Sequence, residues 1–137
     1  QLTAPAPAAT LAPSMAAIDR LFAYDKVEAI VAALEADDSD FAGKTLATLS
    51  TKSPRSLHVT LRLLRLGRRA TRLEDCLERE FAATDAVLAN PDFYEGVRAA
   101  VIDKDRNPRW QPATLDAVSE ADIAAFFPSE HERLFSG

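Results

Sequence analysis

NPDFYEGVRAAVIDKDRNPRW, from Asn90 to Trp110, is the stretch that says most about the architecture of this chain. Asn90 and Pro91 interrupt what precedes them, because proline has no N–H to donate within a helix. A new helix is predicted from about Asp92, with apolar side chains at helical spacing. These side chains are Phe93, Val97 and Val101. Residues 103–112 are charged and interrupted by prolines, which predicts a loop, and this loop contains the only tryptophan.

The rest of the chain also predicts helices, and no segment has the alternating pattern of a strand. Ser53 and Pro54 form a strong helix start, since the hydroxyl can accept free N–H groups and proline fits the first helical position. Gly67 is expected to end that helix in the left-handed conformation. Further starts are predicted at Ser14, at Asp25 with Glu28, at Thr71 with Glu74, and at Ser119 with Asp122. The expected fold class is all-α.

Two regions are expected along the chain. Residues 1–13 are rich in alanine and proline, which is typical of a mobile arm or linker. Residues 14–137 are expected to form one helical region. Much of its apolar content is alanine, which favours helix but buries little area. The core of this chain is therefore expected to be thin.

Composition and charge argue against several functions. The net charge of −5 opposes nucleic-acid binding, because phosphate binding needs a positive field. The apolar runs are far too short to span a membrane, and the N-terminus lacks the apolar centre of a signal peptide. A single cysteine, Cys76, allows no internal disulfide and fits a reducing compartment. We therefore expect a cytoplasmic protein with no nucleic-acid or membrane partner. The chain does not begin with methionine, which fits a cut or processed polypeptide or an expression boundary.

No catalytic or metal site follows from the residues. The glycines stand singly, so the sequence has no phosphate-binding glycine loop. His58 and His131 lie far apart without cysteine or carboxylate at ligand spacing, and His58 is interpreted as a surface or packing residue. Acidic neighbours of Cys76 disfavour the thiolate that a nucleophile needs. We therefore predict no catalytic residue, no metal and no cofactor.

Two groups of basic residues each allow two interpretations. Arg62, Arg65 and Arg69 are expected along one side of a helix, where they form either a patch for an anionic ligand or, as we favour, a solvated face. The second group consists of Lys104, Arg106 and Arg109 beside Trp110. Cations next to an aromatic ring suit phosphates and a stacking purine. In the alternative, Asp103 and Asp105 pair with these charges and the indole is buried.

Four segments, in this order and spacing, resemble the 3-hydroxyisobutyryl-CoA hydrolases, a branch of the crotonase (enoyl-CoA hydratase/isomerase) superfamily. They are VEAIVAALEAD (Val27 to Asp37), SPRSLHVTLRLLR (Ser53 to Arg65), LEDCLEREF (Leu73 to Phe81) and DFYEGVRAAVIDKDRNPRWQPATL (Asp92 to Leu115). The resemblance covers nearly everything from Ser14 to Phe127. The segment IDKD-x-x-P-x-W, from Ile102 to Trp110, points to the hydrolase branch.

The resemblance implies a C-terminal helical part of a crotonase-type α/β enzyme whose β/α core is absent from this chain. That core would supply the oxyanion hole and the carboxylates of a thioesterase acting on 3-hydroxyisobutyryl-CoA in valine breakdown. The implied partners are this N-terminal core, the acyl-CoA substrate and further copies in a homo-oligomer. Lys104 is the nearest equivalent of a basic residue that contacts CoA phosphates in some crotonases, and Trp110 stands beside it.

Two alternatives remain from the sequence. One is the C-terminal region of an enoyl-CoA hydratase or isomerase sister enzyme. The other is a stand-alone helical interaction module. In each case the chain alone is expected to be catalytically inactive.

Overall fold

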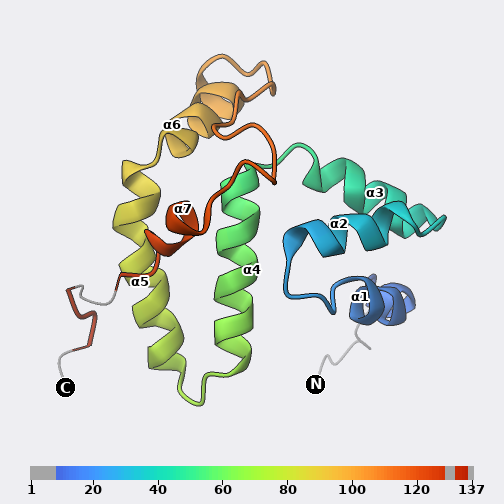
Figure 1. Ribbon diagram of the computed structural model, residues 1–137, viewed down its shortest axis with the longest axis horizontal. Coiled ribbons are helices and arrows are strands. Elements are labelled where there is room, and N and C mark those ends of the chain that lie inside the picture. Colours follow the sequence, from blue (N-terminus) through green and yellow to red (C-terminus); the bar gives the residue numbers. More distant parts are fainter. Residues whose placement is uncertain (1–8, 129–131, 136–137) are drawn as a thin grey trace, which may run out of the picture.

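The computed structural model describes residues 9–128 and 132–135. Within these residues it contains helices and no strand, which confirms the all-α prediction (Figure 1). In chain order the elements are the 3₁₀ turn η1 (Ala12–Ser14), α1 (Met15–Leu21), α2 (Val27–Glu35), α3 (Asp40–Leu49), α4 (Pro54–Arg68), α5 (Leu73–Ala89), α6 (Pro91–Val97), the π-helical turn η2 (Arg98–Ile102) and α7 (Glu120–Ala124). Residues 1–8 of the predicted arm lie outside the described residues, and η1 occupies its end.

The two longest helices, α4 and α5, form an antiparallel pair (Figure 1). The short α7 packs against α4, while α1, α2 and α3 gather beside α4 on the side away from α5 (Figure 1). α6 follows directly from α5, at the end of the pair opposite the α4–α5 turn (Figure 1). The beginning of α4 and the beginning of α6 therefore lie near each other.

Two small apolar clusters are packed on either side of α4. The first consists of Leu21, Ile30, Leu34 and Ala42, and the second of Val59, Ala83, Ile123 and Phe126. Leu61 of α4 packs against the first cluster and Leu63 against the second. Burial of a leucine contributes about 1.5–3 kcal/mol, but only Leu21 and Leu34 are almost fully buried among the large side chains of the described residues. The core is thin, as the alanine content predicts.

Large apolar side chains stay exposed along α5, α6 and η2. They are Leu73, Leu77, Phe81, Val87 and Leu88 on α5, and Phe93, Tyr94, Val97, Val101 and Ile102 on α6 and η2. Leu73 is 71% exposed and Ile102 is 69% exposed. The spacing of Leu73, Leu77 and Phe81 places them along one side of α5. Grouped apolar side chains of this kind are typical of interaction surfaces.

Two of the predicted helix starts are confirmed by their hydrogen bonds. Pro54 opens α4, and the Ser53 hydroxyl accepts the N–H of Ser56. Ser119 and Asp122 form a reciprocal capping box at the start of α7. Both starts combine a short polar side chain with free N–H groups, and that combination depends on local sequence alone.

Three other starts were wrong in detail. The residues before α2 and α5 are Lys26 and Arg72, and neither caps its helix with a side chain. Asp25 instead binds Arg65 of α4, at 2.8 Å, so a tertiary ion pair takes the carboxylate that a capping box would need. Ser14 precedes α1, but η1 already leads into that helix and the Ser14 side chain makes no capping bond.

Gly67 does not end α4 as predicted. The helix continues through it to Arg68, and no described glycine has a positive φ. A Cβ at this position would lie 4.0 Å from the Cys76 sulfur, which is ordinary contact distance. The chain therefore leaves α4 through right-handed turn conformations, without the left-handed residue that favours glycine.

Candidate functional site: a basic loop held by Arg98

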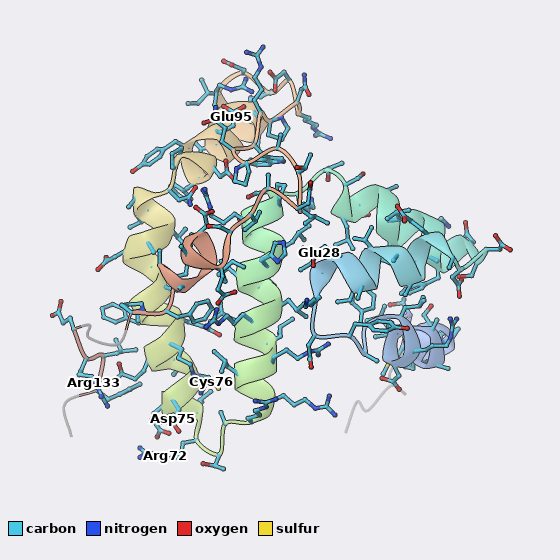
Figure 2. The ribbon with its side chains drawn as sticks, in the orientation of Figure 1. Glu28, Arg72, Asp75, Cys76, Glu95 and Arg133 are labelled. Atoms are coloured by element: carbon cyan, nitrogen blue, oxygen red, sulfur yellow. The ribbon has the colours of Figure 1, made fainter. Side chains whose placement is uncertain are left out.

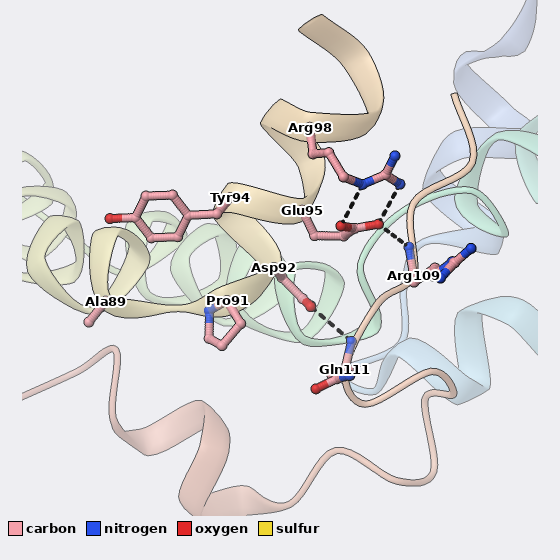
Figure 3. Close-up of a pocket in the computed structure, with 8 residues that line it drawn as sticks. All are labelled: Ala89, Pro91, Asp92, Tyr94, Glu95, Arg98, Arg109 and Gln111. Atoms are coloured by element: carbon pink, nitrogen blue, oxygen red, sulfur yellow. Dashed lines mark hydrogen bonds and ion pairs between the residues drawn. The ribbon is translucent and has the colours of Figure 1, made fainter. Parts of the chain in front are cut away.

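The candidate site is built on α6, η2 and the loop that follows them. Asn90 starts α6 by accepting the N–H of Asp92 at 2.9 Å. After Val97 the chain widens into the π turn, in which the N–H of Asp103 donates to the carbonyl of Arg98 at 2.8 Å. Such π turns insert one extra residue into a helix and often accompany functional sites. Here the turn sends residues 103–111 back along α6 (Figure 3).

Buried Asp92 fastens the far end of this loop to α4. One oxygen of Asp92 accepts the Ser53 hydroxyl at 2.5 Å. The other accepts the N–H of Gln111 at 2.8 Å (Figure 3). The residue is only 6% exposed. Because a buried carboxylate is costly unless its oxygens are hydrogen-bonded, these two bonds fix the loop end and the start of α4 together.

Arg98 holds the middle of the loop. Its guanidinium makes a two-pronged contact with Glu95, at 2.7 and 2.9 Å, and binds Asp103 and Asp105 at 2.7 Å each. It also donates to the carbonyl of Asn107 at 3.1 Å. Glu95 in turn accepts the N–H of Arg109 at 2.7 Å (Figure 3). One guanidinium, with donors arranged as a planar fork, thus gathers three carboxylates and a carbonyl.

These contacts favour the ionised form of two of the carboxylates, Glu95 and Asp105. The Arg98 guanidinium, helped by the N–H of Arg109, lowers the pKa of Glu95 to about 2. Arg98 and the N–H of Asn107 likewise lower the pKa of Asp105. The same bonds raise the pKa of Arg98 above its ordinary value. Glu95, Asp105 and Arg98 are therefore held in their charged forms.

The other cations of the loop face solvent. The side chains of Lys104, Arg106 and Arg109 are exposed, and no carboxylate in the described residues forms an ion pair with any of them. Lys104 and Arg106 have positive φ values of 56° and 53°. Left-handed backbone is unfavourable for such side chains and persists where surrounding contacts impose it. Of the two interpretations of this loop, the pairing of Asp103 and Asp105 with these three cations was wrong, because both acids bind Arg98.

Trp110 anchors the loop to the body of the fold. Its indole N–H donates to the carbonyl of Thr51 at 3.1 Å, and the ring is half-buried. A Cβ at Gly96 would lie 3.4 Å from the indole, so a glycine at this position lets the ring approach α6 closely. Lys104 and Trp110 thus belong to one loop, but the contacts of Trp110 lie toward α6 and Thr51.

A hollow of about 700 Å³ lies beside this loop. Pro91, Tyr94, Arg98 and Arg109 are among the residues that line it (Figure 3). The hollow thus brings apolar and cationic groups together. Arg98 was not assigned a role from the sequence, although an arginine three residues after Glu95 and close to two further acids carries a detectable signal for an ion-pair cluster.

Two of the three arginines of the predicted patch have structural partners, whereas Arg69 is exposed and forms no ion pair within the described residues. Arg62 binds Glu120 and stacks on the Phe127 ring, 4.8 Å from its centroid. Arg65 binds Asp25 and two carbonyls before α2. Neither arrangement is the solvated face that we favoured, and neither leaves a free cation for an anionic ligand. Both arginines join α4 to other parts of the fold.

The remaining candidates are placed apart from the basic loop. His58 is a packing histidine on α4, with 11% of its side chain exposed. Its Nε2 lies 3.3 Å from a Glu28 oxygen. Cys76 lies near the α4–α5 turn, far from Glu95 at the opposite end (Figure 2). His131 falls outside the described residues. Within residues 9–128 and 132–135 no cluster of metal-ligating side chains is found, and no helix there is long and apolar enough to cross a membrane.

Comparison with known families places the chain. Residues 1–127 match the family described as enoyl-CoA hydratase/isomerase. The chain belongs to this family. The chain is 45% identical over 117 residues to 3-hydroxyisobutyryl-CoA hydrolase, mitochondrial, from Danio rerio. The match covers 85% of this chain and 30% of that protein. It is 41% identical over 112 residues to the Homo sapiens protein of the same name, covering 82% of this chain and 29% of that protein.

Two solved structures are also similar to this chain. A carnitinyl-CoA dehydratase from Mycobacterium thermoresistibile has a TM-score of 0.89 and 38% identity, over 96% of this chain and 38% of that one. An enoyl-CoA hydratase from Rhodobacter sphaeroides 2.4.1 has a TM-score of 0.81 and 39% identity, over 92% and 38%. The all-helical chain corresponds to part of a crotonase-type enzyme, as the resemblance implied.

The comparisons also bear on extent and location. The chain spans about 30% of the length of the curated relatives it matches. Those relatives are named as mitochondrial proteins, which speaks against the cytoplasmic location that we expected. That expectation rested on the single cysteine and the N-terminal residues, neither of which distinguishes one reducing compartment from another.

Proposed function

We propose that this chain is the C-terminal helical part of an acyl-CoA thioester hydrolase that acts on 3-hydroxyisobutyryl-CoA in valine breakdown. The observation that carries the proposal is the 45% identity over 117 residues with a relative of that name. The relatives from Xenopus and Homo sapiens support it at 41–44% identity. The segment from Ile102 to Trp110 lies within the loop that projects the free cations, so the part most typical of the hydrolase branch is also the candidate site.

In this proposal the loop contributes to CoA binding. CoA carries a pyrophosphate and a ribose phosphate at the end remote from its thioester. Lys104 is exposed and without an ion-pair partner among the described residues, so its ammonium is available to a phosphate. Trp110 contributes by anchoring the loop and by the exposed part of its ring, on which a purine can stack.

The catalytic groups are assigned to the core that the proposed partner supplies. The described residues near the loop include no nucleophile beside a base, and their carboxylates are occupied by Arg98, Ser53 or backbone N–H groups. The exposed apolar faces of α5 and α6 are proposed to pack on that core or on another copy. Covering these faces would bury the apolar area that the chain alone leaves in water.

A second candidate is a hydratase or dehydratase of the same family. The TM-score of 0.89 with a carnitinyl-CoA dehydratase favours it. This alternative uses the same CoA-binding loop and differs only in the chemistry of the core.

Product analysis separates the two. An enzyme that contains this chain and a crotonase core would be incubated with 3-hydroxyisobutyryl-CoA. Release of free CoA thiol in step with substrate loss supports the hydrolase. Formation of an unsaturated acyl-CoA without free thiol supports the dehydratase and contradicts the hydrolase.

A further inference from the structure

The acidic and basic side chains of the loop are sorted by position. Asp103 and Asp105 both bind Arg98, while the residues that alternate with them, Lys104 and Arg106, are exposed and form no ion pair within the described residues. On α6, Glu95 binds Arg98 and accepts the N–H of Arg109, and the Arg109 side chain stays exposed. Four cations and three carboxylates thus lie close together on α6, η2 and the loop, but one cation, Arg98, binds all three carboxylates.

We propose that Arg98 is a positioning residue for CoA: by holding Glu95, Asp103 and Asp105, it keeps the other three loop cations available to phosphates. This inference rests on the proposed CoA-binding function of the loop. Arg98 is itself only partly accessible, with 29% of its side chain exposed, and its donors are already used by four partners. It therefore acts through its neighbours and does not need to touch the ligand.

The physical reason is competition between carboxylates and phosphates. Asp103 and Asp105 are adjacent in sequence to Lys104 and Arg106, so a freed carboxylate would be present at a high effective concentration beside each cation. A phosphate arriving from solution would then have to displace an intramolecular ion pair. Arg98 removes this competition because its planar fork binds several carboxylates at once, which a lysine ammonium cannot do with the same geometry.

A double-mutant cycle in the complete enzyme, in which this chain accompanies a crotonase core, tests this. The affinity of each variant for CoA would be measured by calorimetric titration. Arg98→Gln should weaken CoA binding about tenfold, the size of one lost charge-assisted contact. In that background, Asp103→Asn with Asp105→Asn should recover most of the loss. With Arg98 present, the same two changes should alter the affinity less than about threefold, because the carboxylates are already sequestered.

The outcomes are distinguishable. If the two aspartate changes alter the affinity for CoA equally with and without Arg98, the positioning role of Arg98 is overturned. The change in affinity would then reflect only the altered net charge of the loop. A recovered affinity cannot arise from a merely unfolded loop, and amide spectra of each variant check the fold. A matched control replaces exposed Asp19 and Asp38, on and beside helices away from α6 (Figure 1), and should recover nothing in the Arg98→Gln background.

Lys104→Ala separates this inference from the function beneath it. If Lys104→Ala weakens CoA binding while Arg98→Gln does not, the loop binds CoA and only the positioning role is wrong. If the enzyme binds CoA as well with Lys104→Ala, the CoA-binding function of the loop fails and the inference fails with it.

Discussion

At the scale of single residues, one guanidinium determines the ionisation of its surroundings. Arg98 lowers the pKa of Glu95 from its ordinary 4.5 to about 2 and also lowers that of Asp105. Neither effect needs deep burial, because both come from direct charge-assisted hydrogen bonds. A group whose pKa is lowered by folding stabilises the fold above its unfolded pKa and loses that contribution as the pH falls toward its folded pKa.

Stability should therefore decline between about pH 4.5 and pH 2, partly through Glu95. Glu95→Gln removes the titrating group together with its ion pair. We expect the variant to be less stable at neutral pH and to show a shallower decline across this window. Thermal unfolding followed by circular dichroism at several pH values measures both. Parallel curves for the parent chain and the variant would contradict the assignment to Glu95.

At the scale of elements, the link between α4 and α6 depends on Asp92. Its two oxygens join the Ser53 hydroxyl, which also caps α4, to the backbone at Gln111 after the loop. A residue that is almost fully buried thus connects two helix starts and one loop end. Its loss would free all three segments together.

Asp92→Ala should lower the free energy of unfolding by about 2 kcal/mol, since it leaves a buried hydroxyl and a backbone N–H without their acceptor. Urea unfolding measures the change. Asp85→Ala is the matched control, because Asp85 is exposed on α5, and its effect should stay within about 0.5 kcal/mol. A similar small effect for both variants would show that Asp92 does not connect these elements.

The sequence predicted the helices well because apolar spacing and proline positions act locally. It also located the loop, with Lys104 and Trp110 on it. It failed where a distant residue decided the outcome: Asp25 binds Arg65, 40 residues away, and caps no helix. Arg98 was missed because its importance lies in a π turn that brings Asp103 and Asp105 back to it, and no local pattern encoded that turn.

At the scale of the whole molecule, two thin clusters support a chain whose largest helices leave apolar faces in water. The chain matches about 30% of each relative. In the proposed enzyme, the remaining part supplies the core on which these faces pack. In the proposed enzyme, acyl-CoA chemistry belongs to the core and nucleotide binding to the helical part.

The chain alone should be predominantly helical, should bind a dye specific for apolar surface, and should not hydrolyse acyl-CoA thioesters. The helical content follows from the helices of the described residues, and the dye binding follows from the exposed apolar residues of α5 and α6. Circular dichroism, dye fluorescence and a thiol-release assay test the three. Turnover well above the buffer rate by purified chain would contradict the assignment of all catalytic groups to the core.

The most direct test of the CoA-binding claim compares two substrates of the complete enzyme, in which this chain accompanies a crotonase core. Lys104→Ala should raise KM for the CoA thioester about tenfold and leave kcat nearly unchanged, because phosphates remote from the thioester are bound equally in the ground and transition states. KM for a pantetheine thioester, which lacks the nucleotide, should change little. An unchanged KM for the CoA thioester would contradict the claim, and an equal loss with both substrates would show damage to the helical fold instead.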